Sequence, residues 1–107
     1  MTWSVFFLDG RVKSELEAQP KDIQARFLRI SGLIADHGLE RVHEPYIKHL
    51  EGPLWEMRMQ GKDGIARAIY VTARGKRVII VRVFAKKTQK TPRREIDLAL
   101  ARAKEVQ

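Results

Sequence analysis

The sequence predicts an α+β fold, in which a small antiparallel-rich sheet carries an N-terminal helical hairpin and a C-terminal helix. Apolar residues recur at helical spacing in the first third of the chain and again at its end. Between these regions the residues alternate between apolar and polar or run continuously apolar, as strands do. The segments in order give β-α-α-β-β-β-α, with the helices packed on one face of the sheet. A chain of 107 residues has the size of one domain, so we expect a single domain over residues 1–107.

The N-terminal third is expected to form one strand and two helices. Residues 3–8 are rich in aromatic and β-branched side chains, which favours a strand. Asp9 can cap a first helix over residues 11–18, which Pro20 ends. A second helix then runs up to Gly38, which closes it. The apolar positions expected to face the core are Val12 and Leu16 on the first helix and Ile23, Phe27, Ile30 and Ile34 on the second.

The middle of the chain is expected to form a loop and three strands. Residues 43–53 have no periodicity and contain two prolines and a glycine, which predicts a loop. Strands are expected over residues 54–60, 65–72 and 77–84, with a turn at residues 74–76. The third strand is nearly continuous in valine and isoleucine, which is typical of a strand inside a sheet.

The last helix is expected to start at Thr91 and Pro92, with the threonine as cap and the proline at the first helical position. Its apolar stripe consists of Ile96, Leu100, Ala103 and Val106.

Charge is the most informative bulk property. Residues 1–63 carry 9 Lys/Arg and 10 Asp/Glu, whereas residues 64–107 carry 12 Lys/Arg and 3 Asp/Glu, within a total net charge of +8. This asymmetry indicates a polyanionic partner, which could be nucleic acid, an acidic protein or an anionic membrane. A basic surface that only confers solubility is the plain alternative.

Other composition features exclude several classes of protein. The chain has no cysteine, which rules out disulfides and thiolate metal sites and fits a reducing, cytoplasmic location. The first apolar stretch stops at Asp9 and lacks a basic region before it, so we expect neither a signal peptide nor a membrane span. His37, His43 and His49 have no ligand spacing, and we expect no metal and no cofactor.

Three arginines on the expected strands are candidate phosphate ligands. Arg58 shares a strand face with Glu56, either as a phosphate clamp or as an ordinary pair on a solvated face. Glu56 could orient Arg58 or serve as a base, and the orienting role is favoured. Arg67 lies on an otherwise apolar face, where a guanidinium needs either a partner or a function. Arg82 shares a face with Val78, Ile80 and Phe84, and could extend the cationic floor or pair with a helix carboxylate.

A basic arm follows the last strand. Lys86 and Lys87 lie where the strand runs out into a loop, a common place for functional residues. Lys90, Arg93 and Arg94 extend this arm to the start of the last helix, whose free amides also favour phosphate. The plain alternative is a solvated loop. Trp3 and Trp55 could stack on bases, but Trp55 aligns with Met57 and Met59, which favours core packing.

Two motifs stand out in the second half of the chain. The first is Leu54-Trp55-Glu56-Met57-Arg58, followed by Arg67; the second is Phe84-Ala85-Lys86-Lys87-Thr88-Gln89-Lys90-Thr91-Pro92. With the order of the expected elements, they resemble the RelE/HigB toxin superfamily, and in particular its phage-derived HigB-like branch. The resemblance implies a RelE-like fold and a metal-independent, ribosome-dependent mRNA endoribonuclease. It also implies a cognate antitoxin, a helix-turn-helix protein that holds the toxin inactive, with no membrane partner.

The chain departs from the RelE branch at one strand. That branch places lysines where this chain has Leu54 and Glu56, so only the arginines and the lysine pair carry over. The resemblance assigns Arg58, Arg67, Lys86 and Lys87 to holding and polarising the scissile phosphate. Two other functions remain open: a non-catalytic nucleic-acid-binding module, and a protein-interaction module that docks an acidic partner.

Overall fold

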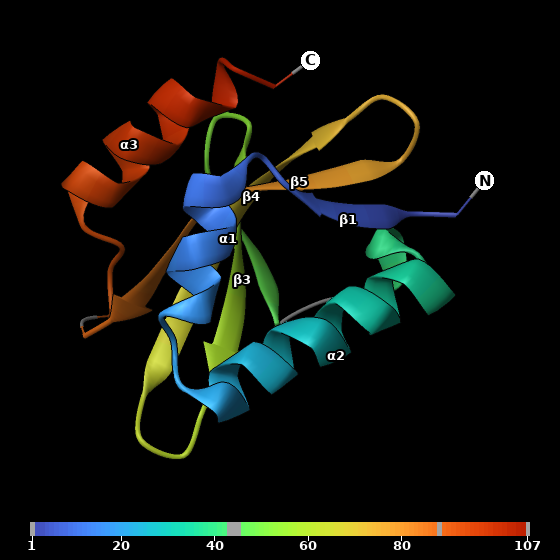
Figure 1. Ribbon diagram of the computed structural model, residues 1–107. Coiled ribbons are helices and arrows are strands. Elements are labelled where there is room, and N and C mark those ends of the chain that lie inside the picture. Colours follow the sequence, from blue (N-terminus) through green and yellow to red (C-terminus); the bar gives the residue numbers. More distant parts are fainter. Residues whose placement is uncertain (1, 43–45, 88, 107) are drawn as a thin grey trace.

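The computed structural model describes residues 2–42, 46–87 and 89–106. They form a five-stranded sheet in the order β1-β5-β4-β3-β2, in which β1 pairs with β5 in parallel and the other pairs are antiparallel. Figure 1 shows the sheet between α3 on one side and α2 on the other. The strands are β1 Ser4–Phe7, β2 Ile47–Glu51, β3 Leu54–Gln60, β4 Ile65–Ala73 and β5 Arg77–Lys86. The helices are α1 Gly10–Glu17, α2 Lys21–His37 and α3 Arg93–Ala103, with a short 3₁₀ turn, η1, at Leu39–Arg41.

Local signals set the ends of several elements as predicted. The Asp9 side chain accepts hydrogen bonds from the backbone amides of Arg11 and Val12, so it caps α1. Gly38, with φ 88°, ends α2 in a backbone region that glycine tolerates best. The turn between β4 and β5 has positive φ at both Gly75 and Lys76.

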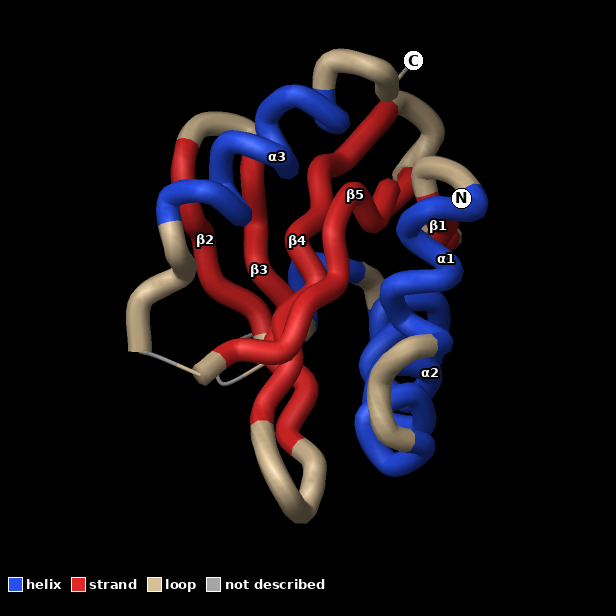
Figure 2. Tube along the Cα trace, turned by 60° about the vertical axis from the view of Figure 1, so that its left-hand side comes forward, coloured by secondary structure: helices blue, strands red, loops and turns tan. Residues whose placement is uncertain are grey.

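The helices cover both faces of the sheet, which corrects the expectation that all would pack on one face (Figure 2). The two cores arise because alternate residues of the interior strands point to opposite sides. One core joins α1 and α2 to Met57, Met59, Ala66, Ala68, Tyr70, Val78 and Ile80. The other joins α3, through Ile96 and Ala99, to Leu54, Ile69, Val71, Ile79, Val81 and Phe84.

Part of the segment predicted as a loop is strand β2. Ile47 pairs with Met57 and is buried, so this short edge strand is held by its neighbour rather than by a pattern of its own. Gly52, with φ 52°, makes the turn into β3. Residues 43–45, including His43, lie outside the described residues, as does Thr88 of the second motif.

A bulge in β5 changes the face on which Arg82 lies. The register shifts so that Ile80 pairs with Tyr70 and Arg82 pairs with Ile69, leaving Val81 as the extra residue. Arg82 therefore shares the α3 side with Phe84, as predicted, but lies opposite to Val78 and Ile80. Simple alternation gives the wrong face here because the extra residue of a bulge reverses the side of the sheet to which each later side chain points.

Trp55 and Thr91 also lie differently from the predictions. Trp55 shares its face with Met57 but is 38% exposed, because the helices cover only the other end of this face. The edge of its ring contacts the ring of His49, at 5.0 Å between centroids. Thr91 does not cap α3: the N-cap is Pro92, which has no side-chain cap bond, and the threonine hydroxyl donates to Glu56 instead.

Candidate functional site

Glu56 is a buried carboxylate at the centre of a group of cations on the α3 side of the sheet. Its side chain points to this side because β3 alternates, and Leu54 on the same side packs in the core under α3. The residue is 2% exposed, although the sequence suggested a solvated face. Its partners are Arg67, Lys86 and Thr91 rather than Arg58. Glu56 therefore orients cations from the two neighbouring strands.

Arg67 of β4 lies beside Glu56 and is 9% exposed. Its Nε is 3.2 Å from Glu56 Oε1, at an angle that does not make a hydrogen bond. Burial lowers the pKa of the Arg67 guanidinium, the Glu56 charge opposes this shift, and the Arg58 charge adds to it. The guanidinium has thus lost much of its water, and its ion pair with Glu56 includes no hydrogen bond from Nε.

Lys86 is the last residue of β5, and its side chain is 2% exposed. Its Nζ is 3.8 Å from Glu56 Oε1. Burial lowers the pKa of the Lys86 ammonium; Glu56 opposes this, whereas the charges of Arg67, Lys48 and Arg58 add to it. A lysine in this state is easier to deprotonate than an exposed one, as a proton donor requires.

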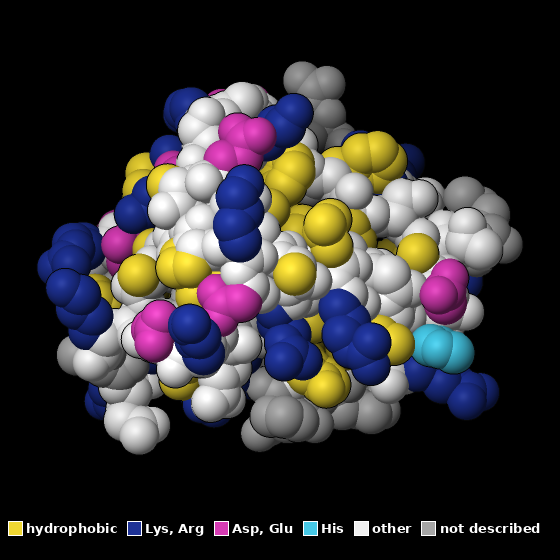
Figure 3. All heavy atoms as spheres, turned by 60° about the horizontal axis from the view of Figure 1, so that its bottom comes forward, with side chains coloured by type: hydrophobic (Ala, Val, Ile, Leu, Met, Phe, Trp, Pro, Cys, Tyr) yellow, Lys and Arg dark blue, Asp and Glu magenta, His cyan; other side chains and the backbone are white. Residues whose placement is uncertain are grey.

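Arg58 and Lys48 complete what we term the cationic cluster: Lys48, Arg58, Arg67 and Lys86 around Glu56. Arg58 pairs with Arg67 across β3 and β4, and Lys48 pairs with Glu56 across β2 and β3, which puts all of them on one side of the sheet. Figure 3, which brings the bottom of Figure 1 forward, shows several Lys and Arg side chains on this face, interspersed with hydrophobic and acidic ones.

Several buried polar atoms in the cluster have unused hydrogen-bonding capacity. The side-chain atoms found buried without a hydrogen-bond partner in the described residues are Ser31 Oγ, Glu56 Oε1, Arg58 Nε, Arg67 Nε and Arg102 Nε. Three of these five belong to the cationic cluster. Buried polar groups are normally paired, so such a concentration indicates a place where a polar ligand can bind.

Arg82 lies outside the cluster, in an ion-pair network with helix carboxylates. Its Nε is 2.7 Å from Glu95 Oε1 of α3, and its Nη1 is 2.9 Å from Glu15 Oε2 of α1. Arg102 of α3 also contacts Glu15, at 2.9 Å, and donates to the carbonyl of Val81. Of the two possibilities left open for Arg82, the structure shows the ion-pair partner.

The basic arm divides into different environments. Lys87, Lys90 and Arg94 are exposed. Arg93 is 60% exposed at its side chain and is held by two carboxylates, with Nη1 2.7 Å from Glu51 Oε1 and Nε 2.9 Å from Asp97 Oδ1. Arg93 therefore joins α3 to β2, in addition to any role in binding.

A known protein family matches most of the chain. The family described as phage-derived protein Gp49-like (DUF891) matches residues 14–104. The chain belongs to this Gp49-like family. The family is one of RelE/HigB-like toxins, so the resemblance drawn from the two motifs is confirmed. No curated protein sequence matches the chain significantly.

Two solved structures resemble the Gp49-like chain. One is the archaeal RelE-RelB complex from Pyrococcus horikoshii OT3, with a TM-score of 0.58 and 25% identity over 81% of this chain and 98% of that chain. The other is E. coli toxin RelE in the free state, in a variant with two arginines replaced by alanine. It has a TM-score of 0.67 and 14% identity over 95% of this chain and 98% of that chain. The α+β fold predicted from sequence is thus confirmed as RelE-like.

Sequence reasoning on this Gp49-like chain missed several residues. Lys48 lay in the predicted loop, and only the strand pairing brings it to Glu56. Glu15, Glu95 and Arg102 occupy ordinary amphipathic helix positions, and nothing in their spacing shows that they meet at Arg82. An alternation argument that placed Glu56 beside a buried Leu54 could have indicated its burial.

The remaining candidates are peripheral. His37 and His49 are exposed, and His49 Nε2 lies 2.9 Å from the Gly52 carbonyl oxygen. Over the described residues there is no group of three or more His, Cys, Asp or Glu side chains that could hold a metal ion. None of the helices in the same residues has the length and apolar character needed to cross a membrane.

Proposed function

We propose that this chain is the toxin of a type II toxin–antitoxin pair and cuts mRNA on the ribosome. The observation that supports this most is the cationic cluster, in which four cations lie around one buried carboxylate, Arg67 and Lys86 contact it directly, and three buried atoms lack hydrogen bonds. A phosphodiester supplies the negative charge and the acceptor oxygens that such a cluster lacks.

The cluster can serve each step of metal-independent RNA cleavage. The 2′-hydroxyl oxygen attacks the adjacent phosphorus, the bond from phosphorus to the 5′-oxygen breaks, and the products are a 2′,3′-cyclic phosphate and a 5′-hydroxyl. Arg58 and Arg67 bind the non-bridging oxygens, whose charge grows in the transition state. Lys86, with its lowered pKa, gives a proton to the leaving 5′-oxygen.

Glu56 has two possible parts in this scheme. It contacts both Arg67 and Lys86, so it orients the two cations that face the phosphate. Its Oε1 has no hydrogen-bond partner, so within the cluster it is also the group that can accept the 2′-hydroxyl proton. Lys87, Lys90, Arg93 and Arg94 add positive charge along the path of the RNA, which strengthens binding at low salt.

A cognate antitoxin, which we expect to be a helix-turn-helix protein, would hold this activity in check. The complex of RelE with RelB among the structural relatives supports an antitoxin partner. The work of such a toxin lies where translation occurs, in the cytoplasm.

The test is cleavage of mRNA by the purified protein, mapped by primer extension with and without translating ribosomes. We expect cuts within codons only when ribosomes are present. Arg67→Ala, and Lys86→Ala combined with Lys87→Ala, should each lower the cleavage rate by about a hundredfold or more, as loss of a transition-state donor does. Harmless overexpression, or equal cleavage of free RNA, would contradict the proposal.

Two controls separate the site from the scaffold. Arg29→Ala removes an exposed arginine from α2 and should leave cleavage unchanged. Ile80→Ala, in the core beneath α1 and α2, should lose about 2–5 kcal/mol of stability and lose activity only because it unfolds. Tight ribosome or RNA binding that leaves the message intact would instead identify a non-catalytic nucleic-acid-binding module.

A further inference from the structure

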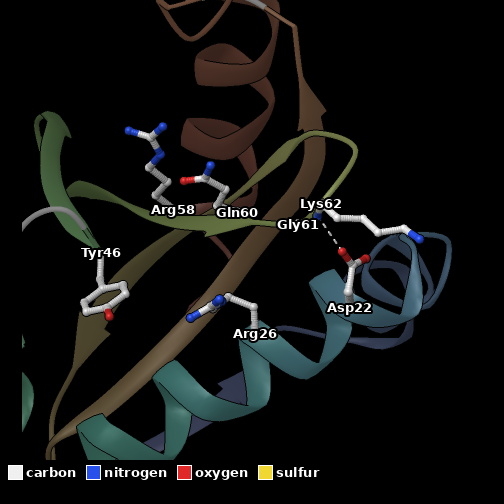
Figure 4. Close-up of a pocket in the computed structure, with 7 residues that line it drawn as sticks. All are labelled: Asp22, Arg26, Tyr46, Arg58, Gln60, Gly61 and Lys62. Atoms are coloured by element: carbon white, nitrogen blue, oxygen red, sulfur yellow. Dashed lines mark hydrogen bonds between the residues drawn. The ribbon is translucent and has the colours of Figure 1, made fainter.

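A hollow of about 580 Å³ lies along the edge of the sheet, where β3 approaches the start of α2 (Figure 4). Arg26 and Asp22 line it from α2, and Tyr46 lines it from just before β2. In Figure 4 Arg58 and Gln60 point away from α2, on the other side of β3, while Tyr46 and Arg26 lie on the α2 side. The hollow therefore wraps around the strand edge, and Arg58 belongs both to it and to the cationic cluster.

Within the described residues, the hollow lies where no strand pairs with the outer side of the last two residues of β3. The last backbone bond described on this side of β3 runs from the Arg58 amide to the Tyr46 carbonyl, at 2.7 Å, so Met59 and Gln60 have no strand on their outer side among the described residues. The far wall is fixed: the Lys62 amide donates to Asp22 Oδ2 at 2.7 Å, and a Cβ on Gly61 would lie 2.6 Å from the same oxygen. Gly61 thus permits a close approach of the turn to α2 that any larger residue would prevent.

The lining has the chemistry of a site for an unpaired nucleotide. The Tyr46 ring and the Arg26 guanidinium offer flat faces on which a base can stack. The Gln60 amide can donate and accept hydrogen bonds at a base edge. Three cations, Arg26, Arg58 and Lys62, line the hollow against the single carboxylate of Asp22, which already accepts from the amides of Ile23 and Lys62.

We infer that this hollow binds one nucleotide of single-stranded RNA, adjacent to the phosphate that the cationic cluster holds. The base stacks on Tyr46 and Arg26 on the α2 side of β3, and the backbone passes over the open strand edge to Arg58. An apolar peptide is a poor occupant because the lining is dominated by charged and amide groups. The inference deepens the proposed function, on which its assignment of RNA as the ligand rests.

Binding is measured without cleavage, so the hollow can be tested apart from the nuclease activity. The probes are the four nucleoside 3′-monophosphates, titrated into the ¹⁵N-labelled full chain and followed by amide chemical shifts. We expect saturable shifts at Gly61, Lys62 and Arg58, at lower concentration than with inorganic phosphate. Tyr46→Leu keeps an apolar side chain against the core but removes the aromatic face, and should weaken binding about fivefold or more.

A matched pair of arginines on α2 provides the control. Arg26→Ala should weaken nucleotide binding by a similar factor, whereas Arg29→Ala, which removes the same charge from an exposed position on the same helix, should change it less than about twofold. Equal loss in both variants, equal affinity for inorganic phosphate, or no saturable shift at the hollow would each overturn the inference. Failure of ribosome-dependent cleavage with binding intact would overturn the proposed nuclease function and leave the nucleotide site standing.

Discussion

Two groups of cations, most of them buried or partly buried, lie on the α3 side of the same sheet, and they differ in how many carboxylates accompany them. In the ion-pair network, Arg82 and Arg102 meet Glu15 and Glu95, so charges are matched one to one. In the cationic cluster, Arg67 and Lys86 both contact the single carboxylate of Glu56, and Arg58 and Lys48 add two further positive charges nearby. Matched charges join helices to the sheet, whereas an unmatched excess leaves capacity for an anion from outside.

The pKa of Arg82 in the network moves in the opposite direction to the pKa values of Arg67 and Lys86 in the cluster. The hydrogen bond to Glu95 is the main cause that raises the pKa of Arg82. Burial is the main cause that lowers the pKa of both Arg67 and Lys86, and one carboxylate is too little to reverse it. Functional sites often hold groups in such unfavourable states, and stability is given up there in exchange for binding and catalysis.

The largest effect on stability should come from breaking the matched network at Glu15. Its carboxylate contacts Arg82 and Arg102 and also accepts a hydrogen bond from the backbone amide of Val83. Val83 lies beyond the part of β5 that pairs with β1, so the carboxylate takes the place of a strand partner there. Glu15→Ala would leave two largely buried guanidinium groups short of a partner, at a cost of about 3–5 kcal/mol. Thermal unfolding should show a fall in Tm of more than about 10 °C.

Glu17→Ala is the matched control, because it removes an exposed carboxylate from the same helix and should change stability by less than about 0.5 kcal/mol. A Glu15→Ala protein that is as stable as this control would show that α1 and α3 are held by apolar packing alone.

The fold was largely predictable because most elements carry local signals. The Asp9 cap, the Gly38 stop and the alternation of β3 each depend on neighbouring residues, and each was predicted correctly. The features that were not predicted depend on contacts between residues far apart in the sequence. Strand β2 exists because β3 pairs with it, and the bulge at Val81 is visible only in the register against β4.

The sequence predicted several residues that the structure brings together in the candidate site, but not the contacts among them. Arg58, Arg67 and Lys86 were singled out and do lie together, because strand spacing and the strand end place them on one side of the sheet. The pairing of Glu56 with Arg67 and Lys86, and the separation of Arg82 from them, required the three-dimensional structure. An arginine in a hydrophobic strand looks the same in sequence whether its partner is a helix carboxylate or a substrate.

Removing the carboxylate of Glu56 from the cationic cluster should have an intermediate effect on stability. Glu56→Gln keeps the shape of the side chain but takes away the one anion that the cluster contains. Because Glu56 raises the pKa of both Arg67 and Lys86, its loss increases repulsion among the cations, and we expect a loss of about 1–3 kcal/mol in stability.

RNA binding and cleavage should respond in opposite ways to Glu56→Gln. A phosphate no longer competes with the carboxylate, so the affinity for RNA should rise, while kcat should fall by about a hundredfold because Arg67 and Lys86 lose their orientation. Single-turnover kinetics separate the two quantities. A parallel loss of affinity and rate would mean that Glu56 only holds the fold together.

The smallest effect on stability is expected at Lys86, and it should depend on pH. Because the folded pKa of Lys86 is lowered, the folded protein holds this proton less tightly than the unfolded chain does. Keeping Lys86 charged therefore costs stability at every pH below its folded pKa, and the cost vanishes as the pH rises to the ordinary value of 10.5. Lys86→Met fills similar space without the charge, so the variant should be more stable than the wild type at pH 7, by less than about 1 kcal/mol.

The difference in Tm between Lys86→Met and the wild type, followed from pH 7 to about 10.5, should shrink toward zero as the wild-type lysine loses its charge. Comparing the two proteins at each pH removes the titration of all other groups. The Lys86→Met variant should also lose cleavage, so that the protein gains stability as it loses function. A gain in stability together with a loss of cleavage is the result expected if Lys86 binds substrate and has no fully matching carboxylate. A variant that is less stable at pH 7 would place Lys86 with Arg82, among the cations that serve the scaffold.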